Sequence, residues 1–206
     1  NQYGNRNLVI NGAMKVAQRG TSSTGLGASS GYYTCDRWRM NFNTSGRLTM
    51  TQETITDLPG FANCIKLACT TADTSIASGE NVFLQHRFEG QNLQQLQKGT
   101  STAKEVTLSF YVKGNASATY TAELRDQDNT RFNGQEFSVT TSWTRVSLTY
   151  AGDTTGTFDD DNANSLTLGF FLHAGSSYTG GTFSSNTWHT TTNQRAGDNQ
   201  TSFFDS

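Results

Sequence analysis

Two runs of alternating residues constrain the fold of this chain more than any other feature of its sequence. Val106–Val112 and Ser165–His173 each carry an apolar side chain at every second position. Because successive side chains of a β-strand point to opposite faces of the sheet, this period predicts half-buried strands. Shorter runs of the same kind recur between turn signals, which is typical of antiparallel β-sandwiches. We therefore predict an all-β, antiparallel, two-sheet sandwich with Val106–Val112 as a central strand.

The segments between these runs predict the remaining elements. Asn92–Gln97 places two leucines three residues apart, on one face of a short helix, and this is the one sizeable helix that we expect. Leu8–Ile10 is apolar and precedes an Asn-Gly pair, so it is predicted to be a short strand that ends in a turn. Gly20–Gly31 is rich in Ser, Thr and Gly without an apolar period, and we interpret it as a long surface loop.

The length and charge of the chain limit its organisation and its partners. With 206 residues it is long enough for one sizeable β-domain, which we place at residues 8–206, with residues 1–7 as a linker or the end of a preceding segment. Its net charge of −2 provides no electrostatic footprint for nucleic acid or an anionic membrane. No apolar run is long enough to cross a bilayer. We therefore expect neither nucleic-acid binding nor membrane insertion.

The three cysteines do not indicate a disulfide framework, because their number is small and odd. Cys64 and Cys69 fall in one predicted strand. Five residues of strand span roughly 16 Å, far more than the ~7 Å that separates bridged Cα atoms at most. Free thiols are therefore expected, as suits assembly in a reducing cytoplasm. A bond from Cys35 to either of the others is the alternative.

No arrangement of residues in the sequence predicts catalysis. His86, His173 and His189 are scattered, and no H-E-x-x-H, G-x-S-x-G or P-loop motif occurs. His86 lies between two apolar residues of one strand face, so a satisfied core histidine is the preferred interpretation. Glycoside hydrolysis needs two acids that flank a cleft, and the sequence singles out no such pair. We therefore predict no catalytic residues and no enzymatic activity.

One acidic run supplies candidate metal ligands. Asp159, Asp160 and Asp161 stand together in a long predicted loop, and hard carboxylate oxygens favour Ca²⁺. The run does not match an EF-hand, and a solvated acidic turn is the preferred interpretation. No cofactor is therefore expected, and a structural calcium ion is the alternative.

Five segments occur in a fixed order between Asn7 and Tyr178: NLVINGAMKVAQRGTS, YTCDRW, HRFEGQNLQQL, VTLSFYVKG and SWTRVSLTYAGDTTGTF. In this order they resemble the jelly-roll module of phage tail and tail-fibre proteins, which is similar to carbohydrate-binding modules. The resemblance implies a jelly-roll topology and a structural protein of the virion, in a tail fibre or another tail or head appendage, assembled in the host cytoplasm. Related carbohydrate-binding jelly rolls often hold calcium near an NGD-like motif, whose carboxylate is missing here at Asn11-Gly12-Ala13.

The resemblance also implies that the chain assembles with other virion proteins and with copies of itself, as a trimer by analogy with fibres. The candidate subunit contacts are Phe171, Phe183, Phe203 and Phe204. Modules of this family finish with a further strand that pairs near the N-terminal run. We therefore expect that the polypeptide continues beyond Ser206, or that another chain covers an edge with unpaired backbone groups.

Weak, multivalent attachment to host-surface glycans is the expected contribution of such a module, and because the net charge is near zero, neutral glycans suit the surface better than polyanions. Sugar recognition uses flat aromatic faces beside hydrogen-bonding side chains, because a pyranose has an apolar face and a polar rim. Predicted loops that combine these groups supply the candidate contacts Tyr32, Tyr33, Asn129, Arg131, Phe132, Tyr178 and Trp188. For each of them, packing within the domain or against a neighbouring subunit is the alternative. A stand-alone carbohydrate-binding module and, third, a glycan-cleaving enzyme are the alternative functions.

Overall fold

The computed structural model of the protein describes residues 7–205, so residues 1–6 of the predicted linker and Ser206 lie outside the described residues. Eleven strands account for most of its regular structure. They are β1 (Ser22–Leu26), β2 (Gly31–Tyr32), β3 (Trp38–Asn43), β4 (Arg47–Thr54), β5 (Asn63–Thr71), β6 (Asn81–Glu89), β7 (Val106–Val112), β8 (Ala118–Asp126), β9 (Arg131–Val139), β10 (Thr144–Tyr150) and β11 (Asn164–Ala174).

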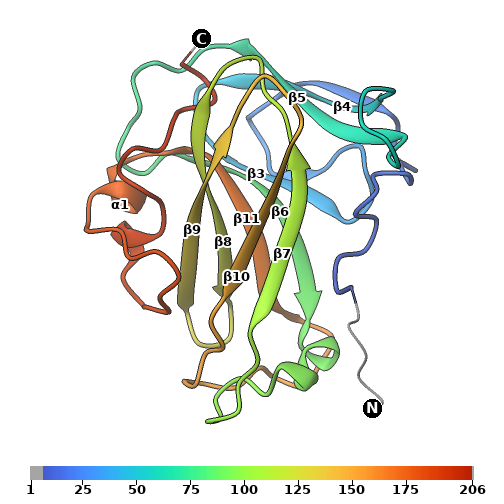
Figure 1. Cartoon of the computed structure of the whole chain (residues 1–206). Coiled ribbons are helices and arrows are strands. Elements are labelled where there is room, and N and C mark those ends of the chain that lie inside the picture. The colour runs from blue at the N-terminus through green and yellow to red at the C-terminus, as the bar shows by residue number, and fades with distance from the viewer. Residues whose placement is uncertain (1–6, 206) are drawn as a thin grey trace.

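The strands form an antiparallel sandwich, which confirms the predicted all-β class (Figure 1). One layer is a six-stranded sheet in the order β2-β3-β6-β11-β8-β9. The opposing layer is divided into a three-stranded sheet, β1-β4-β5, and a two-stranded sheet, β10-β7. Every paired strand runs antiparallel to its neighbour.

The core lies between the two layers and follows from the alternating runs. In β11 the side chains of Leu166, Leu168 and Phe170 are buried, the last beneath Phe110 of β7 with ring centroids 5.0 Å apart. Burying one large apolar side chain contributes about 1.5–3 kcal/mol, so a few such contacts across the layers hold the sandwich together. His86 is also fully buried here, as predicted, and burial lowers its pKa to about 4. The prediction that it is satisfied holds for Nε2, which contacts Ile10, but is wrong for Nδ1, which has no hydrogen-bond partner among the described residues.

Three sequence predictions about strands need correction. Val106–Val112 is a strand with the predicted bounds, but it is hydrogen-bonded to a neighbouring strand on one side only, to β10. Leu8–Ile10 is not a strand, because the backbone N–H of Ile10 donates to the ring of His86 and not to a sheet neighbour. The predicted loop Gly20–Gly31 contains β1 and the start of β2.

The prediction of a short helix at Asn92–Gln97 is correct in position, but the type of helix differs. The chain around Asn92–Gln97 forms two successive 3₁₀ turns, η1 (Gly90–Asn92) and η2 (Gln94–Leu96). The α-helix of the described chain is instead the single turn α1 (Ser176–Thr179), and a further 3₁₀ turn, η3 (Thr192–Gln194), follows it. None of the helices in the described part is long and apolar enough to span a bilayer. The three cysteines are free, as predicted, with Cys64 and Cys69 both in β5.

Candidate functional site

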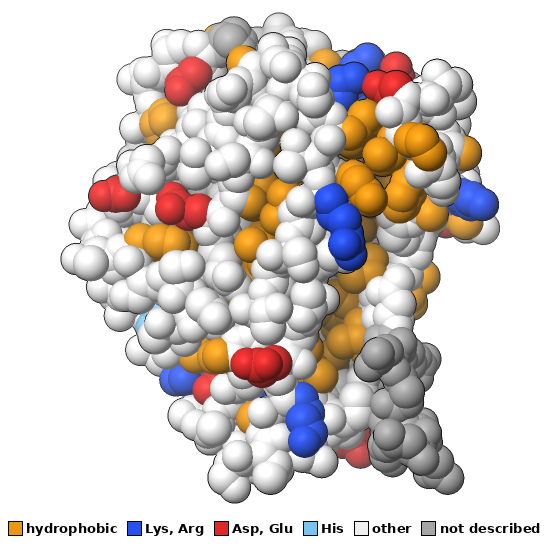
Figure 2. Space-filling view, viewed as in Figure 1, with side chains coloured by type: hydrophobic (Ala, Val, Ile, Leu, Met, Phe, Trp, Pro, Cys, Tyr) orange, Lys and Arg blue, Asp and Glu red, His pale blue; other side chains and the backbone are white. Residues whose placement is uncertain are grey.

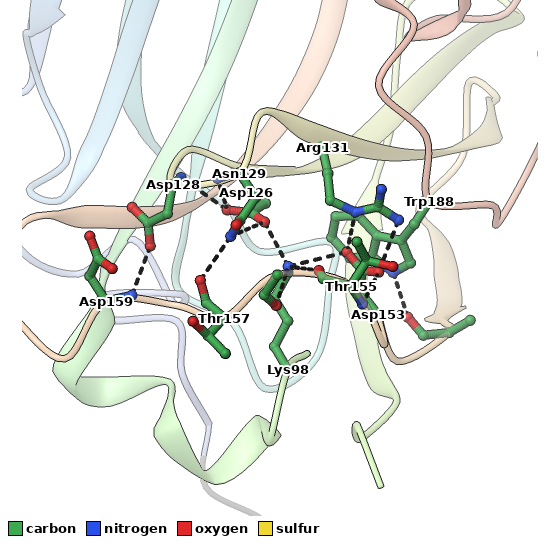
Figure 3. A network of polar contacts seen from close by, with 12 residues as sticks. Lys98, Asp126, Asp128, Asn129, Arg131, Asp153, Thr155, Thr157, Asp159 and Trp188 are labelled. Carbon is green, nitrogen blue, oxygen red and sulfur yellow. Dashed lines mark hydrogen bonds and ion pairs between the residues drawn. The ribbon is translucent and has the colours of Figure 1, made fainter. Parts of the chain in front are cut away.

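Three of the predicted glycan contacts lie at one end of the sandwich, around the buried ammonium group of Lys98 (Figure 3). Lys98 Nζ is 2.7 Å from Oδ2 of Asp126 and 3.2 Å from Oδ2 of Asp153. It also donates to the carbonyl oxygens of Thr155 and Gly156, at 2.6 Å and 3.0 Å. The side chains of Lys98 and Asp126 are 4% and 0% exposed. An ammonium group has three donors and finds four oxygens here, so its hydrogen-bonding capacity is used within the domain.

Arg131 is part of the same network. It lies at the start of β9, and its guanidinium donates two hydrogen bonds to Asp153, at 2.7 Å from Nε to Oδ2 and 3.0 Å from Nη2 to Oδ1. Burial alone would raise the pKa of Asp153, but the bonds from Arg131 and Thr155 and the nearby Lys98 hold it below its usual value. Arg131 therefore orders the loop after β10 through a charged pair that a ligand would have to displace.

Asn129 and Trp188 also direct their polar groups into this network. Asn129 Nδ2 donates to Oδ2 of Asp126 at 3.0 Å and to the carbonyl of Thr157 at 2.8 Å. Trp188 Nε1 donates to the carbonyl of Ala151 at 2.7 Å, and its half-buried ring lies 6.0 Å from Lys98 Nζ. The structure thus brings Asn129, Arg131 and Trp188 together, but their side chains donate hydrogen bonds to acceptors within the domain.

A cavity of about 290 Å³ opens beside this network. Its volume is at the lower limit for small-molecule sites. The polar groups of Gln97, Thr102 and Thr157 are exposed, whereas the ring of Phe158 is only 8% exposed and offers little stacking face. The residues that line the cavity are Leu93, Gln94, Gln97, Lys98, Thr100, Thr102, Thr157 and Phe158.

The remaining aromatic candidates do not join this site. Phe132 is a residue of β9, only 2% exposed, with the guanidinium carbon of Arg195 4.4 Å from its ring centroid. The prediction that Phe132 is a loop residue with a free stacking face is therefore wrong, because β9 begins one residue earlier, at Arg131. Tyr178 packs edge-on against Phe83, and its hydroxyl accepts a hydrogen bond from Asn81.

Tyr32 and Tyr33 lie apart from both groups. Tyr32 is 37% exposed, with the guanidinium carbon of Arg19 5.5 Å from its ring centroid. Tyr33 is half-buried, and its hydroxyl donates to the carbonyl of Ser29. Tyr32 is therefore the aromatic candidate whose ring remains open to a ligand.

Two of the four predicted subunit contacts are wrong. Phe171 is fully buried, because the segment that carries Tyr178 and Arg195 covers the outer face of β11. Phe204 is also fully buried, and its ring lies so close to Gly46 that a Cβ there would be 2.7 Å from it. Phe183 and Phe203 are half-buried, so part of each ring is open to a partner.

The acidic candidates Asp159, Asp160 and Asp161 are all exposed. The backbone N–H of Asp159 donates to Asp128, and Oδ1 of Asp161 accepts from the backbone N–H of Ala163. No set of three carboxylate or imidazole groups that includes them comes within ligand distance among the described residues.

Sequence reasoning missed a cationic surface on the outer face of the six-stranded sheet. The register places Arg39 opposite Gln85, and it places Arg87 opposite Thr167, which in turn faces Arg125. None of these three arginines forms an ion pair within the described residues. Burial first, and then the charge of Arg87, lowers the pKa of Arg39. Their alternation with core residues was visible in the sequence, but only the register shows that they are neighbours.

Comparisons with known proteins do not identify the chain. No protein-family model matches it, and no curated protein matches it. Among solved structures it is similar to the enzymatically active domain of tailspike protein 4 from bacteriophage CBA120, at 12% sequence identity and a TM-score of 0.44. The likeness covers 80% of this chain but 19% of the tailspike chain. Such a TM-score falls short of a shared fold, so the likeness says nothing about what this chain binds.

Proposed function

We propose that the protein is a structural module of a phage virion, in a tail fibre or another tail or head appendage, which associates with copies of itself and acts by binding without catalysis. The virion role is supported by the five sequence segments that, in their order along the chain, resemble the modules of phage tail proteins. The observation that carries the proposal is the divided layer of the sandwich, which leaves two strand edges open.

Dividing the layer opens the edges of β5 and β7, in addition to the edges of β1 and β10, which also end their sheets among the described residues. β7 pairs with β10 and β5 pairs with β4, and in the described chain neither has a strand on its other side. The exposed N–H and C=O groups of such an edge are a template for pairing with another chain. A long, uncovered edge therefore favours a protein that works in an assembly.

Apolar side chains accompany the open edge of β7. Its inward-facing residues are only half-buried: Val106, Leu108, Phe110 and Val112. In the view of Figure 2, hydrophobic side chains gather in a recessed band on the side of β7 that lacks a strand. Phe61 and Tyr111 are 38% and 39% exposed and lie edge to face, with centroids 5.4 Å apart. A contiguous exposed apolar surface of this kind marks an interaction site. A strand of a second copy would pair with the backbone of β7 and cover these side chains.

The test is analytical ultracentrifugation of the protein and of the double variant Phe61→Ser, Tyr111→Ser. Covering the exposed third of both rings contributes about 1–2 kcal/mol, so the variant should raise the dissociation constant about tenfold. Tyr32→Ser, which removes an equally exposed ring elsewhere, is the matched control and should leave association unchanged. Amide exchange should slow in β7 on association but not in β8. A monomer at high concentration would refute the proposal.

Binding of acidic glycans is the second candidate function, and the cationic surface of Arg39, Arg87 and Arg125 favours it. A guanidinium without an ion-pair partner can bind a carboxylate with two parallel hydrogen bonds, although Nη1 of Arg39 already donates to Asn41 and Gln85, at 3.2 Å and 3.3 Å. One such contact gives weak affinity, on the order of 1 mM, so many copies on a virion would be needed for attachment. In a glycan array, acidic glycans should bind the wild type and not Arg39→Ala, Arg87→Ala. Arg145→Ala, at an exposed position of β10, is the control; equal binding by all three proteins would exclude this surface.

A further inference from the structure

A second cluster of polar groups lies at the other end of β6 and β11 from Lys98. Asp73 and Glu80 come from the connection between β5 and β6, and His173 lies near the end of β11. One ligand atom from each falls within 4.8 Å of the other two. His173 Nε2 is 3.7 Å from Oε2 of Glu80 and 4.0 Å from Oδ2 of Asp73. The three side chains are 0%, 15% and 3% exposed, in the order His173, Glu80, Asp73.

The imidazole of His173 has one satisfied nitrogen and one unsatisfied nitrogen. Nδ1 is 2.8 Å from Oγ of Ser202, whereas the buried Nε2 has no hydrogen-bond partner within the described residues. When Nδ1 donates its proton to Ser202, the lone pair of Nε2 points toward two carboxylates. Three electron-rich groups in a buried site repel one another unless a cation lies between them.

The distances suit a metal ion better than a direct ion pair. A charge-assisted hydrogen bond from an imidazolium to a carboxylate would close to about 2.7–2.9 Å, well short of the 3.7 Å and 4.0 Å found here. Bonds from zinc to nitrogen and to oxygen are both about 2.0–2.2 Å, so two ligands of one tetrahedral ion stand about 3.3–3.6 Å apart. The 3.7 Å from Nε2 to Glu80 is close to that spacing, and the carboxylate of Asp73, whose Oδ2 is 4.0 Å from Nε2, would have to approach by a few tenths of an ångström when an ion binds.

Neighbouring groups hold the acidic ligands in place. Oδ2 of Asp73 accepts hydrogen bonds from Oγ1 of Thr44 and from the backbone N–H groups of Ser45 and Gly46, at 2.7, 3.0 and 3.2 Å. These bonds occupy its lone pairs, so Asp73 would bind an ion through its other oxygen, Oδ1. Oε2 of Glu80 accepts from the backbone N–H of Ala77 at 2.7 Å. Hydrogen bonds of this kind, like that between His173 and Ser202, orient the ligands of metal sites.

We propose that Asp73, Glu80 and His173 bind one divalent transition-metal ion of the zinc class, with water completing its coordination. Imidazole is a ligand for zinc and its neighbours in the first transition row, whereas calcium takes oxygen ligands, so this is not a calcium site. The inference is independent of the virion role, because it rests on the cluster alone.

The ion would fasten the C-terminal segment to the sandwich. The backbone N–H of Asp73 donates to the carbonyl of Phe204 at 3.0 Å, and the N–H of Phe204 donates to Oγ of Ser202 at 3.1 Å. The ring of Phe204 lies edge-on to that of His173, with centroids 5.4 Å apart. Metal binding should therefore slow amide exchange at residues 202–204 as well as at the ligands.

The experiment is calorimetric titration of the metal-free protein with Zn²⁺ and, separately, with Ca²⁺, with the bound metal counted by mass spectrometry. One Zn²⁺ per chain should bind, with a rise in Tm, and Ca²⁺ should not compete. Co²⁺ in place of Zn²⁺ should give the visible absorption of a nitrogen- and oxygen-ligated ion.

Variants separate this site from adventitious binding. His173→Gln should abolish binding, and Glu80→Gln should weaken it at least tenfold while keeping an acceptor for the N–H of Ala77. If His173→Gln does not fold, Glu80→Gln tests the site, because Glu80 is the more exposed ligand and its replacement disturbs the core less. The matched control, Asp159→Asn with Asp161→Asn, removes two exposed acids and should bind Zn²⁺ like the wild type. Binding that persists in Glu80→Gln, or that is lost in the control, overturns the proposal, as does the absence of Zn²⁺ binding by the wild type.

Discussion

Replacing Lys98 with methionine tests whether the charged network around it holds the fold together. Met has a similar length, so the change removes the ammonium group and little packing. Asp126, with its side chain 0% exposed, would lose its charge partner but keep hydrogen bonds from the backbone of Asp128 and from Asn129. Asp153 would keep Arg131. Removing one partner of a buried ion pair costs 3–5 kcal/mol, and the bonds that remain favour the lower end, about 3 kcal/mol.

Urea unfolding followed by tryptophan fluorescence measures this loss. With a slope of about 3 kcal/mol per molar urea, the unfolding midpoint of Lys98→Met should fall by about 1 M. Lys66→Met is the matched control, because Lys66 pairs with Glu53 at the surface, with side chains 54% and 41% exposed. Exposed pairs contribute at most about 1 kcal/mol. Equal midpoints for the two variants would refute the buried network, as would strict additivity of Lys98→Met and Asp126→Asn in a double-mutant cycle.

Two further predictions concern single buried groups. Burial lowers the pKa of His86 to about 4, so the unfolded chain takes up a proton at this residue more readily than the folded chain does. The free energy of unfolding should therefore be highest above about pH 6.5 and should fall by up to about 3 kcal/mol between pH 6.5 and pH 4. Unfolding curves across that range check this, and a His86→Gln variant that loses stability just as steeply would contradict it. Tyr150 is fully buried and its hydroxyl donates to the carbonyl of Ala122 at 2.9 Å, so Tyr150→Phe should cost about 1 kcal/mol. Thr107→Val, at an exposed position of β7, should change stability less, and a Tyr150→Phe variant as stable as this control would show that the bond contributes nothing.

The fold class could be predicted because its signal is local. The period of Val106–Val112 and of Ser165–His173 is set by neighbouring residues, and it appears in the structure as β7 and most of β11. The division of one layer into two sheets has no local signal, since it depends on which strands pair across long stretches of chain. The same limit explains Gly20–Gly31, where β1 is a strand only because β4 pairs with it.

The candidate site was less predictable, because its partners are brought together by the fold. Asn129 and Arg131 carry polar groups that suit a sugar, but the acids that bind them lie in β8 and in the loop after β10. Nothing in the sequence near Phe132 shows that Arg195 lies on its ring. Asp73 and His173 are likewise far apart in the sequence, and no local pattern around either of them predicts a metal ligand. Residue type thus predicts what a side chain can bind, and tertiary contacts decide whether it is free to do so.

The distribution of charge separates residues that stabilise the domain from residues that are available to bind a partner. Only 16% of the residues are charged, and six of them lie at the two ends of β6 and β11: Lys98, Asp126, Asp153 and Arg131 at one end, and Asp73 and Glu80 beside His173 at the other. Such groups fix the loops and the C-terminal segment, because a buried charge tolerates few arrangements. The edge of β7 and the outer arginines take no part in either cluster. The contacts at the edge of β7 are exposed ones, between Phe61 and Tyr111 and between Lys113 and Asp57 at 2.7 Å. Because exposed pairs contribute little to stability, we expect variants on these surfaces to alter binding more than the unfolding midpoint.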